Sequence, residues 1–251
     1  MAKTLATIEE LKNFDVNDLS FGPMKKPDAG KGQSGPSSRP SRSTIKYKGN
    51  PLRIQTNLMI LPFQYEQDPN NSTLTFCTKV SDTEGADEEY ANAVIDVFKQ
   101  VQAAAKKVAR ENSQEWFQKT DVAFDDAVDS FAEPLKEHPE GKYPPYLKVK
   151  YYRDSDTGLP QFPVYDGNSR EALHTRQSPC LGFSCADTFA ASTRHILIVD
   201  CSGVWSLNRR GGLTWRVNDV LAYPPLVSFP FKNVPSVADG SHPNDEYRPP
   251  Y

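Results

Sequence analysis

The sequence predicts a mainly β fold, a small antiparallel barrel or sandwich, with a helical segment inserted between its strands. Strand-like alternation of apolar and polar residues recurs between residues 44 and 79 and returns in a long hairpin between residues 194 and 223. Between these regions, residues 82–140 carry apolar residues at helical spacing. This order of strands, a helical insertion and further strands suits such a barrel or sandwich.

The first strands follow a basic segment. Residues 1–42 begin with a short amphipathic piece and continue with Gly, Pro, Ser and Lys, a composition that cannot repay the entropy of folding. We therefore expect residues 1–42 to form a flexible basic arm. Strand patterns then occupy residues 44–48, 52–60 and 72–79, with a turn at 49–51.

The inserted segment, residues 82–140, is acidic, with fifteen Asp or Glu against six Lys or Arg. Its helical spacing predicts two amphipathic helices whose apolar stripes pack on the barrel. The first stripe comprises Tyr90, Val94, Val97, Val101, Ala104 and Val108. The second comprises Trp116, Phe117, Phe124, Val128, Phe131 and Leu135, and it ends at Pro134 and Pro139.

The later strands alternate most clearly. In residues 146–152, the residues Leu147, Val149 and Tyr151 share one face, and Lys148, Lys150 and Tyr152 share the other. In the final hairpin, Asn-Arg-Arg-Gly-Gly at 208–212 predicts a tight turn in which glycine supplies positive φ angles. Alternation places Trp215 with Leu213 and Val217, and Trp205 with Leu197, Val199 and Cys201. We therefore predict that both tryptophans are core residues.

Catalytic and metal-binding patterns do not stand out. The four His residues are scattered, no glycine-rich phosphate loop precedes a helix, and no Ser lies in a nucleophile elbow. The four Cys residues lack zinc-ligand spacing. We expect no enzyme activity, no metal and no cofactor. The absence of a signal peptide pattern and of a long apolar run predicts a soluble, non-secreted protein without a membrane partner.

Cationic residues recur on the exposed faces of the predicted strands, with aromatic residues nearby. A groove that follows a phosphate backbone and stacks unpaired bases requires this combination, so the pattern favours nucleic-acid binding. A solvated sheet face and ordinary exposed turn arginines would look similar on any single strand. The candidate binding residues are Lys46, Lys48, Arg53, Lys148, Lys150, Tyr152, Arg209, Arg210 and Arg216.

Three blocks of the sequence resemble a known family. They are STIKYKGNPLRIQTNLMILPF at 43–63, YPPYLKVK at 143–150, and the segment at 202–217 that begins SGVWS and ends GGLTWRV. They resemble the single-stranded DNA-binding proteins of nucleo-cytoplasmic large DNA viruses, a family similar to the podophage replication single-stranded DNA-binding protein. The resemblance covers about residues 45–222. It implies an OB-fold with helices inserted between strands.

The resemblance also implies a function: sequence-nonspecific binding of single-stranded DNA in viral DNA replication, recombination or repair. Its groove residues would be Lys46, Lys48, Arg53, Lys148, Lys150 and Arg216. The protein would act in the viral replication compartment of the host cell, with replication proteins as partners of its C-terminal tail. Phage members end in a strongly acidic tail with a terminal aromatic residue, whereas this tail has Asp239, Asp245 and Glu246 against Arg248 and ends on Tyr251. Packaging in the virion and the oligomeric state stay open.

The predicted organisation is a flexible arm at 1–42, an OB-like β domain at 43–223 with the insertion at 82–140, and a Pro-rich tail at 224–251. The alternative is a structural virion protein, such as a minor capsid protein, with a β-sandwich core and no DNA binding. The placement of the cations distinguishes the two. A DNA groove needs them in one continuous stripe, and it needs the acidic insertion to pack away from that stripe because like charges repel.

Overall fold

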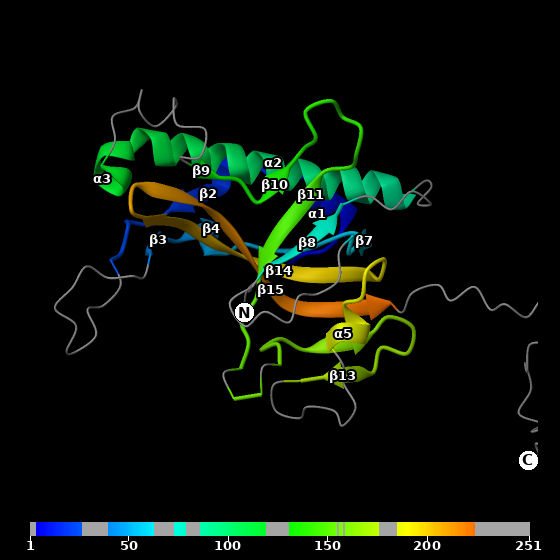
Figure 1. The fold of residues 1–251 in the computed structure, drawn as a ribbon. Helices are drawn as coiled ribbons and strands as arrows, with labels where there is room; N and C mark the ends of the chain where they lie inside the picture. Colours follow the sequence, from blue (N-terminus) through cyan, green and yellow to red (C-terminus); the bar gives the residue numbers. More distant parts are fainter. Residues whose placement is uncertain are drawn as a thin grey trace, which may run out of the picture.

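The computed structural model of the protein describes residues 4–26, 40–62, 73–78, 86–118, 131–154, 156–157, 159–175 and 185–223 (Figure 1). The predicted Pro-rich tail at 224–251 and the middle of the predicted second helix at 119–130 lie outside these ranges. Within the described ranges, no helix combines the length and the apolar character that a membrane span needs.

The centre of the fold is a closed barrel of five strands. Four neighbouring pairs are antiparallel, namely β7 with β8, β8 with β11, β15 with β14, and β14 with β7. The parallel pair of β11 with β15 closes the ring. This is the strand arrangement of an OB-fold, so the predicted mainly β, OB-like fold is confirmed. The strands are β7 (Met59–Ile60), β8 (Thr73–Cys77), β11 (Tyr146–Lys150), β14 (Arg194–Leu207) and β15 (Arg210–Tyr223).

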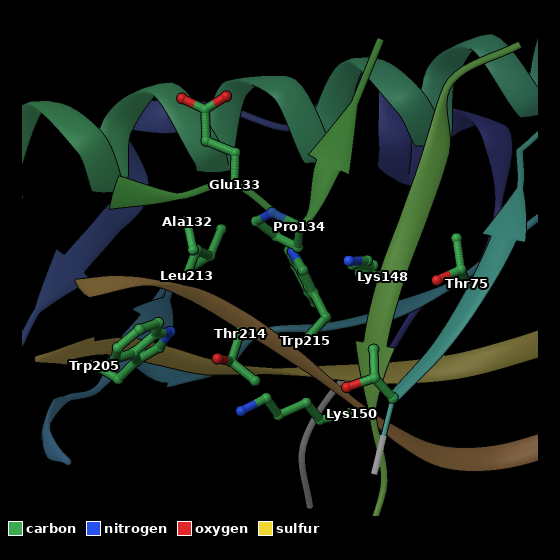
Figure 2. Close-up of a pocket in the computed structure, with 11 residues that line it drawn as sticks. Thr75, Ala132, Glu133, Pro134, Lys148, Lys150, Trp205, Leu213, Thr214 and Trp215 are labelled. Carbon is green, nitrogen blue, oxygen red and sulfur yellow. The ribbon is translucent and has the colours of Figure 1, made fainter. Parts of the chain in front are cut away.

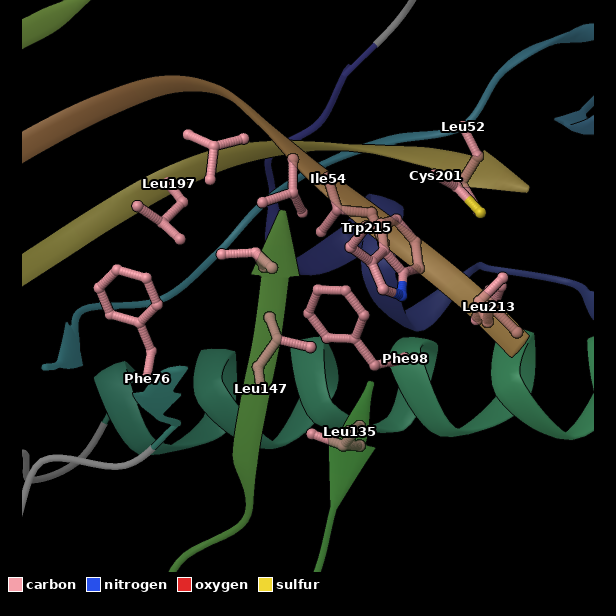
Figure 3. Packing of buried hydrophobic residues seen from close by; sticks show 14 of the residues in the cluster. Leu52, Ile54, Phe76, Phe98, Leu135, Leu147, Leu197, Cys201, Leu213 and Trp215 are labelled. Atoms are coloured by element: carbon pink, nitrogen blue, oxygen red, sulfur yellow. The ribbon is translucent and has the colours of Figure 1, made fainter. Parts of the chain in front are cut away.

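The barrel interior is apolar because alternate residues of its strands point inward. Leu147 and Val149 of β11 and Trp215 of β15 are fully buried. Figure 3 shows side chains from several strands meeting helix α2 (Ala86–Glu111) around Trp215. Phe98 of α2 meets the Trp215 ring edge to face, with ring centroids 4.6 Å apart.

The apolar stripe of α2 docks on this core, as its helical spacing predicts. Val94, Val97 and Val101 are completely buried. Toward the C-terminal end of α2 the buried positions are Ala105 and Ala109, one residue beyond the expected Ala104 and Val108. The small alanine side chains allow the helix to lie close to the sheet.

The prediction that helical structure extends to residue 135 is wrong for the described residues. Helix α3 (Ser113–Phe117) is short, and Gln118 after it adopts a left-handed conformation that ends the helix. Phe131 lies in β9 (Phe131–Ala132) and Leu135 in β10 (Leu135–Lys136), which pair with β15 and β11. Both side chains are buried, so their apolar spacing reflects core positions in two short strands instead of a helix.

The described N-terminal residues also differ from the predicted flexible arm. Residues 4–26 and 40–42 pack on the barrel, with Leu5, Leu11 and Phe14 buried. Their elements, with the strands that follow, are β1 (Thr4–Leu5), α1 (Ile8–Lys12), η1 (Val16–Asp18), β2 (Leu19–Phe21), β3 (Ser41–Ser43), β4 (Ile45–Tyr47), β5 (Asn50–Pro51) and β6 (Arg53–Gln55).

Pairing explains this order. β1 runs parallel to β6, β3 extends the sheet beside β14, and β2, β4 and β5 form a separate small sheet. The single hydroxyl proton of Tyr90 in α2 has two backbone oxygens within hydrogen-bond distance, that of Gln55 at 3.0 Å and that of Ala6 at 3.2 Å. Burial raises the pKa of Tyr90 to about 12, which keeps this donor protonated.

The remaining elements lie at the lower end of the barrel in Figure 1. β12 (Val164–Asp166) pairs in parallel with the end of β15, and β13 (Ala172–His174) pairs with β12. The short helix α5 (Cys185–Thr188) precedes β14. Phe162 and Phe189 fill the space between these elements and are almost fully buried.

Candidate nucleic-acid interface

The outward face of β8, β11 and β15 carries a row of polar and cationic residues held in register. Lys148 and Lys150 of β11 lie opposite Thr75 and Thr73 of β8. Lys150 is also paired with Arg216 of β15. Paired residues project from the same face of a sheet, so the inward burial of Leu147 and Val149 places both lysines outward.

A hollow of about 380 Å³ opens on this face. Thr73, Thr75, Lys148 and Lys150 line one side, and Ala132, Glu133 and Pro134 line the edge formed by the end of β9 and the residues after it. In Figure 2, the two lysines and Trp205 lie on opposite sides of the hollow, with Thr214 between them. The hollow thus combines ammonium groups, hydroxyl groups and two tryptophans, the half-buried Trp205 and the buried Trp215.

Trp205 was predicted to be a core residue, and this prediction is wrong. Its side chain is half-buried and lines the hollow. Up to Cys201 the odd-numbered residues of β14 are buried, but a bulge at Ser202 and Gly203 adds a residue to the strand. The bulge reverses the alternation, so Val204 and Ser206 point inward and Trp205 points outward. No bulge separates Trp215 from Leu213 and Val217, and Trp215 is completely buried, as predicted.

Gly203 permits the bulge. Its φ angle is +96°, and a Cβ there would lie 2.0 Å from the backbone oxygen of Ser43. Both the left-handed backbone and the close approach of β3 exclude an ordinary side chain. A glycine inside an otherwise regular strand is the signal in the sequence that could have indicated the reversal.

The turn of the hairpin also differs from the prediction. Asn208 and Arg209 form the two-residue turn, both with positive φ, and Leu207 pairs with Arg210. Gly211 and Gly212 lie in β15 instead. A Cβ on Gly211 would approach the Phe117 ring to 2.0 Å, and one on Gly212 would approach the backbone oxygen of Ala132 to 2.5 Å. These glycines allow α3 and β9 to pack directly on the strand.

Arg53 and Arg216 lie next to the lysine row and share one carboxylate. Arg53 donates hydrogen bonds of 2.5 and 3.0 Å to the two oxygens of Asp200, and these raise the pKa of its guanidinium. Arg216 reaches the same carboxylate at 3.7 Å. It also lies over the ring of Tyr152, 5.5 Å from its centroid. Asp200 therefore fixes both arginines and offsets part of their charge.

The other predicted residues are placed elsewhere. Lys46 and Lys48 belong to the small sheet and its turn, and neither lines the hollow beside Trp205. Lys48 is 3.4 Å from Asp18, and its hydrogen bond with that carboxylate raises the pKa of Lys48. Arg209 is exposed in the hairpin turn, and Arg210 lines a second hollow beside the first.

Several lining residues were missed in the sequence. Thr73, Thr75 and Thr214 were assigned no binding role, although the alternation of β8 and β15 places them on the lysine face. Arg42 lines neither hollow, but it was also missed: it is exposed and is the cross-strand neighbour of Trp205 on β3. It was assigned to a flexible arm because nothing in its local sequence shows the pairing with β14.

The comparisons find remote structural similarity to phage proteins. The single-stranded DNA-binding protein from bacteriophage Enc34 is 12% identical, with a TM-score of 0.43, over 85% of this chain and 96% of that chain. The same protein in complex with ssDNA gives 14% identity and a TM-score of 0.38, over 76% and 93% of the two chains. The single-stranded DNA-binding protein gp2.5 of bacteriophage T7 gives 11% identity and a TM-score of 0.40, over 76% and 98%.

No protein-family model matches the sequence, and no curated protein matches it. All three structural similarities have TM-scores below 0.5. Membership of the large DNA virus family stays a prediction from the three sequence blocks.

Proposed function

We propose that the chain binds single-stranded DNA without sequence preference and acts in viral DNA replication, recombination or repair. One observation carries the proposal: Lys148, Lys150 and Trp205 surround the same hollow on the outward face of an OB-like barrel. Lysine ammonium groups attract phosphates, and a half-buried indole offers a face on which an unpaired base can stack.

The position of the hollow within the fold supports this proposal. OB-folds bind oligonucleotides on the face of their second and third strands and with the loops beside it. In this barrel those strands are β8 and β11, which provide Thr73, Thr75, Lys148 and Lys150. The position in the fold is an analogy with other OB-folds, and the ammonium and hydroxyl groups of the lining residues support it independently.

The placement of the cations favours DNA binding over a structural virion protein. Lys148, Lys150 and Arg216 form one stripe, with Arg53 beside it through the shared Asp200. Helix α2 packs on the core through the inward face of the sheet, and it contributes no residue to the lining of this hollow. The stripe is therefore open to a polyanion.

The contacts explain why no base sequence would be preferred. Lysines that meet phosphates position a strand without reading its bases. Stacking on Trp205 is available to any base because every base has a π face. Bases in a duplex are already stacked and paired, so access to Trp205 favours single strands.

The test is fluorescence anisotropy with a labelled oligo-dT, titrated against salt, with an unlabelled duplex as competitor. We expect wild-type binding that weakens steeply with salt and resists the duplex. The double variant Lys148→Gln/Lys150→Gln should lower the slope of log K against log salt by about 1.4, or about 0.7 for each phosphate that the variant leaves without a lysine. Exposed substitutions of this kind typically change stability by less than about 0.5 kcal/mol.

The matched control is Lys12→Gln/Lys142→Gln, which removes the same charge from two exposed lysines that do not line the hollow. It should bind like the wild type. Absent or salt-independent binding of the wild type at low ionic strength would refute the proposed function. Equal losses in the control and test variants would refute the placement of the site.

A further inference from the structure

A second hollow of about 480 Å³ adjoins the first and shares Ala132, Glu133 and Trp205 with it. Trp205 therefore stands at the boundary between the two. The second hollow extends from Trp205 toward the hairpin turn, since Arg210 and Gly211 form part of its lining.

Three cations from different parts of the chain line the second hollow. Lys106 comes from α2, Lys136 from β10, and Arg210 from the start of β15. All three side chains are exposed. Two of them belong to the insertion at 82–140, which the excess of acidic residues led us to expect away from any bound phosphate.

The charge of the insertion is unevenly distributed. The acidic first turn of α2 contains Asp87, Glu88 and Glu89, which lie 17 to 19 residues, or about 26 to 28 Å, along the helix from Lys106. This distance is well beyond the screening length of about 8 Å at physiological salt, so those carboxylates have little effect at the hollow.

Among the described residues that line the second hollow, Glu133 is the one with an acidic side chain, and the cation of Lys106 compensates its charge. Its carboxylate is 2.8 Å from the ammonium of Lys106, and the amide of Gln102 donates a second hydrogen bond to it at 3.2 Å. With Lys106 and Glu133 paired, Lys136 and Arg210 leave the hollow with a net positive charge.

We propose that the second hollow binds the phosphodiester backbone of the same DNA strand, which continues past Trp205 toward the hairpin turn. Lys136 and Arg210 contact the phosphates, and Lys106 holds Glu133 away from them. This inference rests on the proposed function, since it requires a strand in the first hollow. The insertion, which lines the edge of the first hollow with Ala132, Glu133 and Pro134, then also contributes a phosphate-binding cation, Lys136, to the binding path.

The test compares two oligo-dT lengths, a 6-mer and a 16-mer, chosen from the range of about 4 to 16 nucleotides that one OB-fold covers. The variant is Lys136→Gln/Arg210→Gln, and the control is again Lys12→Gln/Lys142→Gln. Affinity for the 16-mer is measured directly by anisotropy, and affinity for the 6-mer by its competition with the labelled 16-mer.

We expect the variant to bind the 16-mer more weakly and with a salt slope lower by about 1.4, because it neutralises two fewer phosphates than the wild type. Affinity for the 6-mer should be unchanged, because a strand this short binds within the first hollow and does not reach the second. The charge-preserving variant Lys136→Arg/Arg210→Lys should restore the wild-type slope with the 16-mer.

Each other outcome has a clear meaning. A wild type that binds neither oligonucleotide overturns the proposed function, and this inference with it. A wild type that binds while the Lys136→Gln/Arg210→Gln variant keeps its slope overturns only the second hollow. Equal losses for both lengths also overturn it, because they mean that the two hollows are not successive parts of one path.

Discussion

Replacing Trp205 by alanine should weaken DNA binding while leaving the fold intact. The residue lines both hollows but is not part of the buried core. Its cross-strand neighbours are Gly212, which has no side chain, and the exposed Arg42. The two residues paired with Trp205 therefore leave one side of the indole with little protein packed against it, and a base could stack there.

The magnitude follows from stacking. Removing an aromatic platform typically costs about 1–3 kcal/mol per stacked base. At about 1.4 kcal/mol for each tenfold change, the Trp205→Ala variant should bind oligo-dT about 5- to 150-fold more weakly. The Trp205→Phe variant should lose less, because a smaller aromatic ring remains.

Trp215 supplies the contrast. It is completely buried and meets Phe98 edge to face, so Trp215→Ala should remove about 3–5 kcal/mol from the free energy of unfolding. Urea denaturation of both alanine variants separates a loss of fold from a loss of binding. We expect Trp205→Ala to unfold near the wild-type midpoint and Trp215→Ala to unfold at much lower urea.

Intrinsic fluorescence gives a direct assay of stacking. The chain has three tryptophans. Trp116 and Trp215 are buried, whereas Trp205 is half-buried and lines both hollows. DNA should quench the wild-type emission, and this quenching should disappear in Trp205→Phe while anisotropy still reports binding. The reasoning fails if Trp205→Ala unfolds like Trp215→Ala, or if it binds oligo-dT with wild-type affinity.

Two further predictions concern stability. Gly203→Ala should lower the free energy of unfolding by more than Gly49→Ala. Both glycines have a positive φ, which costs about 1–3 kcal/mol for another residue. A Cβ at position 203 would also lie 2.0 Å from a backbone oxygen, whereas a Cβ at position 49 would face open space. Equal urea midpoints for the two variants would contradict the role of the bulge. Burial lowers the pKa of His195 to about 4. Between pH 6.5 and 4 the unfolded chain therefore binds more protons than the folded chain. The free energy of unfolding should decrease as the pH falls through this window, by up to about 3 kcal/mol. The His195→Gln variant should show a flatter decline in urea midpoints, and parallel pH profiles for the variant and the wild type would count against this cause.

Local alternation predicted the parts of the site that lie on regular strands. The outward Lys148 and Lys150 and the inward Leu147 and Val149 were correctly assigned, because β11 has no bulge and one buried face. Trp215 was also correct, because the irregularity of β15 at Asn218 lies outside the run from Leu213 to Val217 that predicted its inward position. The order of the strands and the insertion predicted a small antiparallel barrel or sandwich, and the resemblance of the three sequence blocks implied the OB-fold.

Long-range pairings limited the rest. The partner of Arg53, Asp200, lies 147 residues away in the sequence, so the ion pair has no local signal. Phe131 and Leu135 occupy strands of only two residues each, which are too short to show alternation. Their strand conformation depends on pairing with β15 and β11. The local sequence shows only the helical spacing of their apolar residues, which led to the wrong prediction.

Glycines within the final hairpin connect the fold to the proposed site. Gly203 reverses the alternation of β14 and so turns Trp205 from the core to the surface. Gly212 admits β9 beside Trp205, and β9 contributes Ala132 to the lining of both hollows. An uninterrupted alternating hairpin with ordinary side chains at these positions would bury Trp205 and push β9 away. In a long strand that folds back on itself, a glycine away from the turn can therefore mark the place where the sheet forms a binding surface.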